Sequence, residues 1–267
     1  AAIPAHSGNA MFVLDPSGTR RGPRTDPLAP HAWIASPFHA RSDFCGTCHD
    51  VGNLAVTRAP DGTYRYNEMG AASPTHDPAA QFPLERTYTE WRLSAFAAGG
   101  VDTGGRFGGA GGGGVSTCQD CHMPRAVGRG CVYGGVRGDL ALHDFAGAAA
   151  PVLDLIAAHT RLDPAVDQAA LARGRDAAVA MLERAASLAL SQDGTQLVVR
   201  VTHETGHKLP TGHIEGRRVW LHVEFRDEAG MLVGEHGRYD TAAAELDEAS
   251  TVVYEMHVKG FTETHPG

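Results

Sequence analysis

Two cysteine pairs, each followed directly by a histidine, are the residues whose spacing carries the clearest chemistry. They read Cys45-Gly46-Thr47-Cys48-His49 and Cys118-Gln119-Asp120-Cys121-His122. Cys-x-x-Cys-His is the attachment signature of c-type haem. Each cysteine adds across one haem vinyl group to form a thioether, and the adjacent histidine binds the iron from one face. The pattern predicts two covalently attached haems c, whose binding residues are Cys45, Cys48, His49, Cys118, Cys121 and His122.

Paired cysteines also serve two other chemistries, which stay open as alternatives. One is a zinc site built from four cysteines, and the other is a redox dithiol of the thioredoxin type. Neither needs a histidine directly after each pair. The gap between the pairs is longer than zinc-ribbon spacing, and no compact βαβ pattern surrounds either pair. The sequence therefore favours haem attachment over both.

Three further segments are similar to segments of the multihaem c-type cytochrome family. They are residues 36–44 before the first motif, residues 85–91 before the second, and TGHKLPTG at 205–212, which precedes 215–218. With the two motifs, the resemblance extends over residues 20–235. Such relatives usually carry further haem motifs upstream. We therefore expect this chain, which starts at Ala1 and stops just after a strand-like stretch, to be a fragment of a protein with more haems.

Each haem iron needs a ligand on its second face, and in members of this family that ligand is commonly another histidine. The resemblance favours His143 and His207 as these distal ligands. His39 stands six residues before Cys45, too close to reach round its own haem but well placed for a neighbouring one. The expected iron ligands are thus His49, His122, His207, His143 and His39.

The turn around His207 suits a ligand. Gly206 before it and Pro210 after it interrupt the strand, so a stiff turn carries the ring. Threonine side chains or backbone carbonyls nearby can accept the second ring N–H, which sets the tautomer that leaves the other nitrogen for iron. The alternative is a tight loop with His207 exposed to water.

Several other residues have weaker claims as ligands. His31 is left open, and Met69 is an alternative thioether ligand. Cys131 is expected to be a small buried apolar side chain. The histidines expected at the surface are His6, His159, His222, His236, His257 and His265.

Composition excludes several classes of protein. The chain has 267 residues, 42% apolar and 20% charged, as in an ordinary soluble protein. Its net charge of −8 argues against a nucleic-acid binder that relies on phosphate contacts. No apolar run is long enough for a transmembrane segment. The expected partners are therefore redox proteins or neighbouring haem-bearing subunits, not nucleic acid.

Apolar periodicity predicts helices over 85–98 and 164–190, the second capped by Asp163. Strands are predicted at 197–201, 219–225 and 251–258, with a turn at 227–230 that leads into 231–233. The side chains expected in the core of these strands are Val199, Val201, Trp220 and Val223.

The fold class predicted is mixed. A largely irregular, haem-packed region with a few helices spans 1–160, a connecting helix spans 161–192, and a small antiparallel β-sandwich-like module spans 193–267 and is incomplete at its C-terminus. The expected function is electron transfer through mainly bis-histidine low-spin haems, as a carrier or conduit without a catalytic residue. The alternative is a multihaem oxidoreductase that acts on a small nitrogen or sulfur compound at a five-coordinate haem. Because haem c is attached outside the cytoplasmic membrane, the expected location is periplasmic, cell-surface or extracellular.

Overall fold

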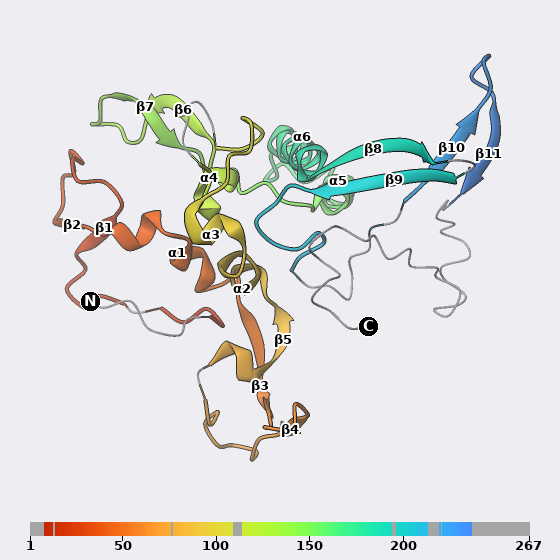
Figure 1. Cartoon of the computed structure of the whole chain (residues 1–267). Helices are drawn as coiled ribbons and strands as arrows, with labels where there is room; N and C mark the ends of the chain where they lie inside the picture. The colour runs from red at the N-terminus through yellow and green to blue at the C-terminus, as the bar shows by residue number, and fades with distance from the viewer. Residues whose placement is uncertain are drawn as a thin grey trace. The chain divides into compact units, whose positions relative to one another are not determined.

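The computed structural model describes residues 8–12, 14–75, 77–108, 114–193, 196–212, 219 and 221–236. The fold is mixed, with 27% helix and 27% strand, and most of its small sheets are antiparallel (Figure 1). The chain divides into two compact units. The first comprises Ala1–Ala185 and Thr205–Ile214, and the second comprises Ala186–Glu204 and Glu215–Gly267. The turn that carries His207 thus belongs to the same unit as both cysteine motifs.

The first unit contains all the described helices. In chain order they are α1 (Ser42–Gly46), α2 (Thr87–Arg92), α3 (Ala95–Gly99), α4 (Cys118–His122), α5 (Ala150–His159) and α6 (Gln168–Ala185). Short 3-10 helices occupy Pro37–Ala40 and Pro78–Ala80. Helix α1 packs against α2 and α4, and α2 packs against α3. Within the part of the chain that is described, no helix combines the length and apolarity needed to cross a membrane.

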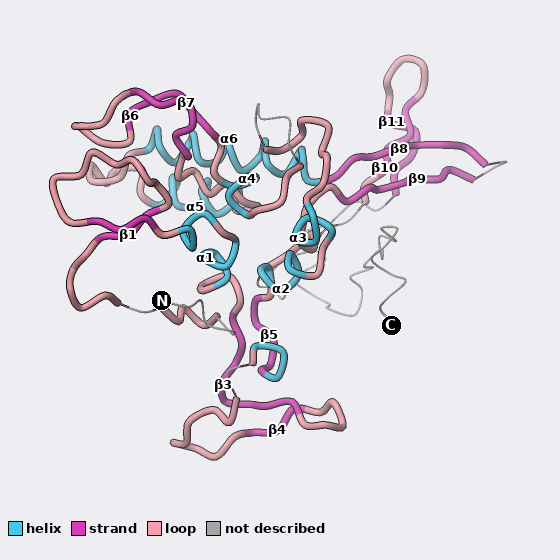
Figure 2. The backbone as a smooth tube through the Cα atoms, turned by 60° about the vertical axis from the view of Figure 1, so that its left-hand side comes forward, coloured by secondary structure: helices cyan, strands magenta, loops and turns pink. Residues whose placement is uncertain are grey.

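Three small sheets complete this unit. Strands β1 (Arg20–Gly22) and β2 (Trp33–Ala35) pair in parallel. Strand β3 (Val51–Arg58) lies between β4 (Tyr64–Tyr66) and β5 (Gln81–Glu85) in an antiparallel sheet, as Figure 2 shows. Strands β6 (Arg125–Arg129) and β7 (Val136–Ala141) form a hairpin. Because β3 starts directly after the first cysteine motif and β5 leads into α2, this sheet brings the two segments together.

The second unit has two separate two-stranded antiparallel sheets among its described residues. They pair β8 (Ala186–Asp193) with β9 (Gln196–His203), and β10 (Val223–Arg226) with β11 (Leu232–His236). The strand predicted at 197–201 lies within β9. The turn predicted at 227–230 is confirmed, since the Asp227 carboxylate accepts from the N–H groups of Ala229 and Met231.

The predicted hairpin of 219–225 with 231–233 is confirmed in part, since β10 pairs with β11. Residues 219, 221 and 222 are not strand, and β10 begins only at Val223. The side chains of Val199, Val201 and Val223 are half-buried, because each pairs in a two-stranded sheet with little to cover it. Trp220 and the strand predicted at 251–258 lie outside the described residues.

Both predicted helices were too long. The one expected over 85–98 is divided into α2 and α3, because Ser94 adopts an extended conformation between them and Glu85 pairs in β5. The one expected over 164–190 is α6, Gln168–Ala185. Its first turn is capped by Asp167, whose carboxylate accepts from the N–H of Ala170. The Asp163 carboxylate instead accepts from the N–H of Ala165, in a turn that precedes the helix. Residues 186–190 leave the helix because their backbone pairs with β9.

The buried apolar side chains of the described residues are few, and half of them are alanines. They are Tyr88, Phe107, Val115, Ala150, Ala178 and Ala185. Cys131 was expected to be buried, and that prediction was wrong. It is exposed because it lies in the tight turn between β6 and β7, where its carbonyl accepts from the N–H of Gly134.

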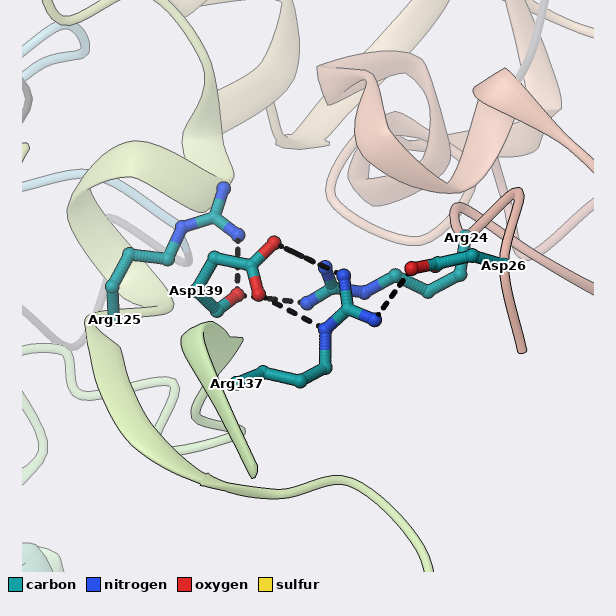
Figure 3. A network of polar contacts seen from close by, with 5 residues as sticks. All are labelled: Arg24, Asp26, Arg125, Arg137 and Asp139. Atoms are coloured by element: carbon teal, nitrogen blue, oxygen red, sulfur yellow. Dashed lines mark hydrogen bonds and ion pairs between the residues drawn. The ribbon is translucent and has the colours of Figure 1, made fainter. Parts of the chain in front are cut away.

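An exposed network of charges fastens the β6–β7 hairpin to the segment before β2 (Figure 3). Arg137 donates to the carboxylates of Asp26 at 2.9 Å and Asp139 at 3.0 Å. Arg24 pairs with Asp139 and also donates to its carbonyl, as Arg125 does. The hydrogen bonds from Arg137 and Arg24 lower the pKa of Asp139 to about 2. The hairpin that follows the second cysteine motif is thereby tied to a segment that precedes the first.

Candidate functional site

The first cysteine motif is a short helix followed by a turn. Cys45 lies on α1, and its carbonyl accepts from the N–H groups of Cys48 at 3.1 Å and His49 at 2.8 Å. The hydroxyl of Thr47 donates to the carbonyl of Phe44. The side chains of Cys48 and His49 are exposed, whereas that of Cys45 is half-buried.

The second motif occupies α4, and its local sequence explains why a helix starts there. Thr117 accepts from the N–H of Asp120, and the Asp120 carboxylate accepts from the N–H of Thr117, which is a complete capping box. One of the two residues between Cys118 and Cys121 therefore fixes the start of the helix that carries both thiols.

The two motifs lie against each other. The N–H of Cys118 donates to the hydroxyl of Ser42 at 3.0 Å, and the Gln119 amide donates to the carbonyl of Arg41 at 2.8 Å. Ser42 and Gln119 are both buried. A hydrogen bond between the two thiols raises the pKa of Cys45 and lowers that of Cys118. The start of the second motif thus contacts the start of the helix that carries Cys45.

Helix α2 packs against the first motif. The N–H of Tyr88 donates to the carbonyl of His49 at 2.8 Å, and its hydroxyl donates to the Asp43 carboxylate at 3.0 Å. A Cβ at Gly46 would lie 2.6 Å from the Tyr88 ring, so glycine is required for this approach. Tyr88 is itself buried and stacks on Trp91.

A buried ion pair fastens the other end of the motif. Asp50, which follows His49, is 2% exposed and accepts from Arg86 at 2.7 Å and from the Thr89 hydroxyl at 2.5 Å. Arg86 also donates to the carbonyls of Pro78 and Gln81. Because every charged group here has partners, the pair holds β3, β5 and α2 in one arrangement around His49.

The structure brings His122 and His207 together. Their ring centroids lie 6.1 Å apart and their planes are 16° from parallel. Each ring is anchored through Nδ1. His122 Nδ1 lies 2.7 Å from the carbonyl of Ala146, and His207 Nδ1 lies 3.0 Å from that of Lys208. Since a carbonyl can only accept, each Nδ1 carries the proton, and each Nε2 is the basic nitrogen that binds a metal.

The His122 ring has the protonation state that a ligand needs. Burial lowers the pKa of His122, and the neighbouring His207 and His49 lower it further. The neutral form therefore prevails at neutral pH. His49, the histidine of the first motif, thus lies close enough to His122 for their charges to interact.

The turn around His207 packs on α2 and α3. A Cβ at Gly206 would lie 3.1 Å from the Phe96 ring and 3.3 Å from Trp91, so the turn approaches both rings closely. The Thr205 hydroxyl donates to the carbonyl of His207 at 2.7 Å. Trp91 in turn donates from its indole N–H to the carbonyl of Ser116, just before α4. The His207 turn, α2 and the second motif therefore form one packed cluster.

The other expected distal ligands, His39 and His143, have ring contacts with phenylalanines. His39 is half-buried between Phe38 and Phe44, and its Nδ1 is buried without a hydrogen-bond partner. His143 is exposed, with its ring 5.6 Å from that of Phe145.

The weaker candidates are exposed. His31 holds only a contact to its neighbouring carbonyl, that of Ala32, and Met69 is 99% exposed. His159 is exposed at the end of α5. His6, His257 and His265 lie outside the described residues.

An open cavity of about 580 Å³ lies beside Cys48. Its walls include the apolar side chains of Val51, Leu54 and Leu84. A space of this size and lining is within the range of sites that hold cofactors, which run from about 300 to about 1,000 Å³.

All five cysteines are free thiols. Across the described ranges, no three or more His, Cys, Asp or Glu side chains gather into a site for a single metal ion. The described part of the chain therefore shows no four-cysteine zinc cluster.

Sequence reasoning missed the residues that support the histidines. Asp50, Arg86 and Glu90 were given no role, although Arg86 and Glu90 lie in a segment noted for its resemblance. The acidic residue directly after His49 was the available signal for Asp50.

Comparison with protein-family models, with curated proteins and with solved structures found no match.

Proposed function

We propose that this chain is an electron-transfer protein with two covalently attached haems c, one at each Cys-x-x-Cys-His motif. Cys118 and Cys121 would hold the second haem, with His122 and His207 on opposite faces of its iron. The observation that carries the proposal is the pairing of His207, from a turn far along the chain, with the motif histidine His122.

The spacing of the two rings supports a shared iron. A metal–imidazole bond is about 2 Å, and a ring centroid lies about 1.2 Å behind its coordinating nitrogen, so two rings on opposite sides of one metal have centroids about 6.4 Å apart. The observed separation is 6.1 Å.

The hydrogen bonds of the two rings support the same assignment. Ligating histidines donate their second ring N–H to a carbonyl or carboxylate, which fixes the tautomer and the orientation of the ring. His122 and His207 both follow this pattern, through Ala146 and Lys208. In the bis-histidine arrangement haem iron supplies reversible one-electron transfer. The chain's part is to hold both rings in place and keep water from the metal.

The first haem would be held by Cys45, Cys48 and His49. The cavity with apolar walls beside Cys48 offers room for an apolar macrocycle. Its distal ligand stays with the candidates His143 and His39. The small core supports the proposal further, since two haems would supply apolar mass that the side chains lack.

The packing of the two motif helices favours transfer between the haems. Because α1 packs against α4 and the N–H of Cys118 donates to Ser42, the thioethers formed from Cys45 and Cys118 would start close together. Electrons would enter and leave through redox proteins or neighbouring haem-bearing subunits. Because haem c is attached outside the cytoplasmic membrane, the protein would lie in the periplasm, at the cell surface or outside the cell.

The test is expression in a host that matures c-type cytochromes, followed by intact-mass measurement and spectroscopy. We expect the mass of two haems and a reduced low-spin spectrum that carbon monoxide leaves unchanged. The Cys48→Ala and Cys121→Ala variants should each weaken or abolish attachment at one site only. An unmodified polypeptide would refute the proposal, and a high-spin haem that binds carbon monoxide in the unaltered protein would favour the enzyme alternative.

A further inference from the structure

Helix α2 has a second role beyond its support of the first motif. On the side of the His207 turn, the Glu90 carboxylate accepts two hydrogen bonds at the same oxygen, Oε2. One comes from the backbone N–H of Lys208 at 3.1 Å, and the other from the hydroxyl of Thr211 at 2.6 Å. These two donors lie on either side of the Leu209–Pro210 pair. Glu90 therefore closes the turn directly after His207.

The direction of the hydroxyl protons follows from the carboxylate. Because an ionised carboxylate only accepts, the Thr211 hydroxyl must give its proton to Glu90. The Thr211 oxygen is then the acceptor for the hydroxyl of Thr87, 2.8 Å away. Two residues of α2 thus hold Thr211 through a chain of hydrogen bonds that ends at the Glu90 charge.

We propose that Glu90 is the positioning residue for the distal ligand His207: its carboxylate holds the turn at Lys208 and Thr211, and so sets how firmly His207 stays on the iron. The proposal rests on the proposed function. Glu90 does not contact the His207 ring in any described interaction and acts through Lys208, whose carbonyl anchors His207 Nδ1. One residue thus receives the ring's hydrogen bond through its carbonyl and gives its own N–H to Glu90.

Glu90 should affect the fraction of molecules in which the sixth coordination position of the iron is open. An external ligand binds only to the fraction of molecules in which His207 has left the iron, so its apparent affinity rises in proportion to that fraction. Hydrogen bonds to a charged group are the stronger ones, and their loss would leave a backbone N–H and a hydroxyl without this acceptor. Glu90→Ala should therefore increase the open fraction, whereas Glu90→Gln keeps an oxygen that can accept both hydrogen bonds.

The experiment measures carbon monoxide binding to the reduced, haem-loaded chain by its absorbance spectrum. For Glu90→Ala we expect an apparent affinity at one haem raised about tenfold or more, since two charge-assisted hydrogen bonds are lost. Glu90→Gln should stay close to the unaltered protein. Thr211→Val provides a second variant, which removes the hydrogen bonds of the Thr211 hydroxyl to Glu90 and Thr87. It keeps Glu90 and the hydrogen bond from the Lys208 N–H, so it should raise the affinity by a smaller factor.

Glu68→Ala is the matched control, because it removes an exposed glutamate from a loop outside this cluster. The inference is overturned if both haems are attached and low-spin, and Glu90→Ala and Thr211→Val bind carbon monoxide no better than the control. It is also overturned if Glu90→Gln behaves as Glu90→Ala does, since a shared acceptor role predicts rescue. A chain without attached haem would refute the proposed function and this inference together, so the mass measurement separates the two failures.

Discussion

The ring of His207 lies nearly parallel to that of His122, with 6.1 Å between their centroids, and each ring is anchored by its Nδ1 to a backbone carbonyl. Such anchoring orders both rings before any metal binds, which lowers the entropic cost of binding. The pair joins the second cysteine motif to a turn that the chain reaches only after α6, β8 and β9.

Replacement of His207 by alanine should remove one axial ligand and leave the rest of the site intact. We expect the haem at Cys118 and Cys121 to become high-spin and to bind carbon monoxide, while the other haem is unaffected. Absorbance spectra and redox titration measure this change. His159→Ala, at the exposed end of α5, is the control. Unchanged spectra and potentials in His207→Ala would remove it from the ligand set.

Gly46→Ala should destabilise the first motif. A Cβ at this position would lie 2.6 to 2.8 Å from three atoms of the Tyr88 ring, so the ring has to move away from α1. Overpacking of this kind costs about 1 to 3 kcal/mol. Urea unfolding followed by circular dichroism measures the loss. Gly138→Ala, where an added Cβ meets nothing within 4 Å, should unfold at the same urea concentration as the unaltered chain.

Asp50→Asn should lower stability strongly, because it leaves the Arg86 charge buried without its partner. Asp50 is 3% exposed and Arg86 14% at the side chain, and removal of one member of a buried pair costs about 3 kcal/mol or more. The midpoint of urea unfolding reports the change. Asp61→Asn breaks the exposed pair with Arg65 and should have little effect. Equal shifts in both variants would contradict the role given to the buried pair.

The Tyr88 phenol should make stability fall at high pH. Burial and the hydrogen bond to the Asp43 carboxylate raise its pKa to about 12, above the usual phenol value of about 10. A group whose pKa is raised by folding stabilises the folded protein fully at pH values below its pKa in the unfolded chain. This contribution is lost as the pH rises through its pKa in the folded protein. The free energy of unfolding should therefore decline between pH 10 and about 12.

Tyr88→Phe provides the comparison for this titration, because it keeps the ring and removes the ionisable hydroxyl. Its free energy of unfolding should decline less steeply over the same pH range. If the free energies of unfolding of the two proteins declined in parallel with pH, the raised pKa of Tyr88 would be contradicted.

Local signals in the sequence predicted local structure well. The turn after β10 was predictable because Asp227 itself supplies the hydrogen bonds that form it. The middle of α6 was predictable from its apolar period, but its end was not. Leu188 continues that period, yet it pairs with Val201 in the β8–β9 hairpin, and only the partner strand decides between helix and strand there.

In the candidate site, too, the residues marked by a local sequence signal were predictable and the contacts between distant residues were not. The motif residues could be read directly, because their signature depends on five consecutive positions. His207 could be chosen as a candidate from its stiff turn, but its pairing with His122 depends on where α2 holds that turn. Asp50 and Glu90 were missed because an acidic residue on a half-polar segment is usually solvated, and nothing local marks the donors that come from distant parts of the chain.

The hydrogen bonds between Glu90 and the His207 turn have a consequence for the order of assembly. Lys208 lies 118 residues beyond Glu90, so this contact closes a long loop and forms only after the chain between them has been made. Both cysteine motifs precede that point. If the chain is exported from its N-terminus, haem can be attached at Cys118 and Cys121 while the distal face of the iron is still open. The arrival of His207 would then be the step that changes the new haem from a reactive, ligand-binding group into a protected electron carrier.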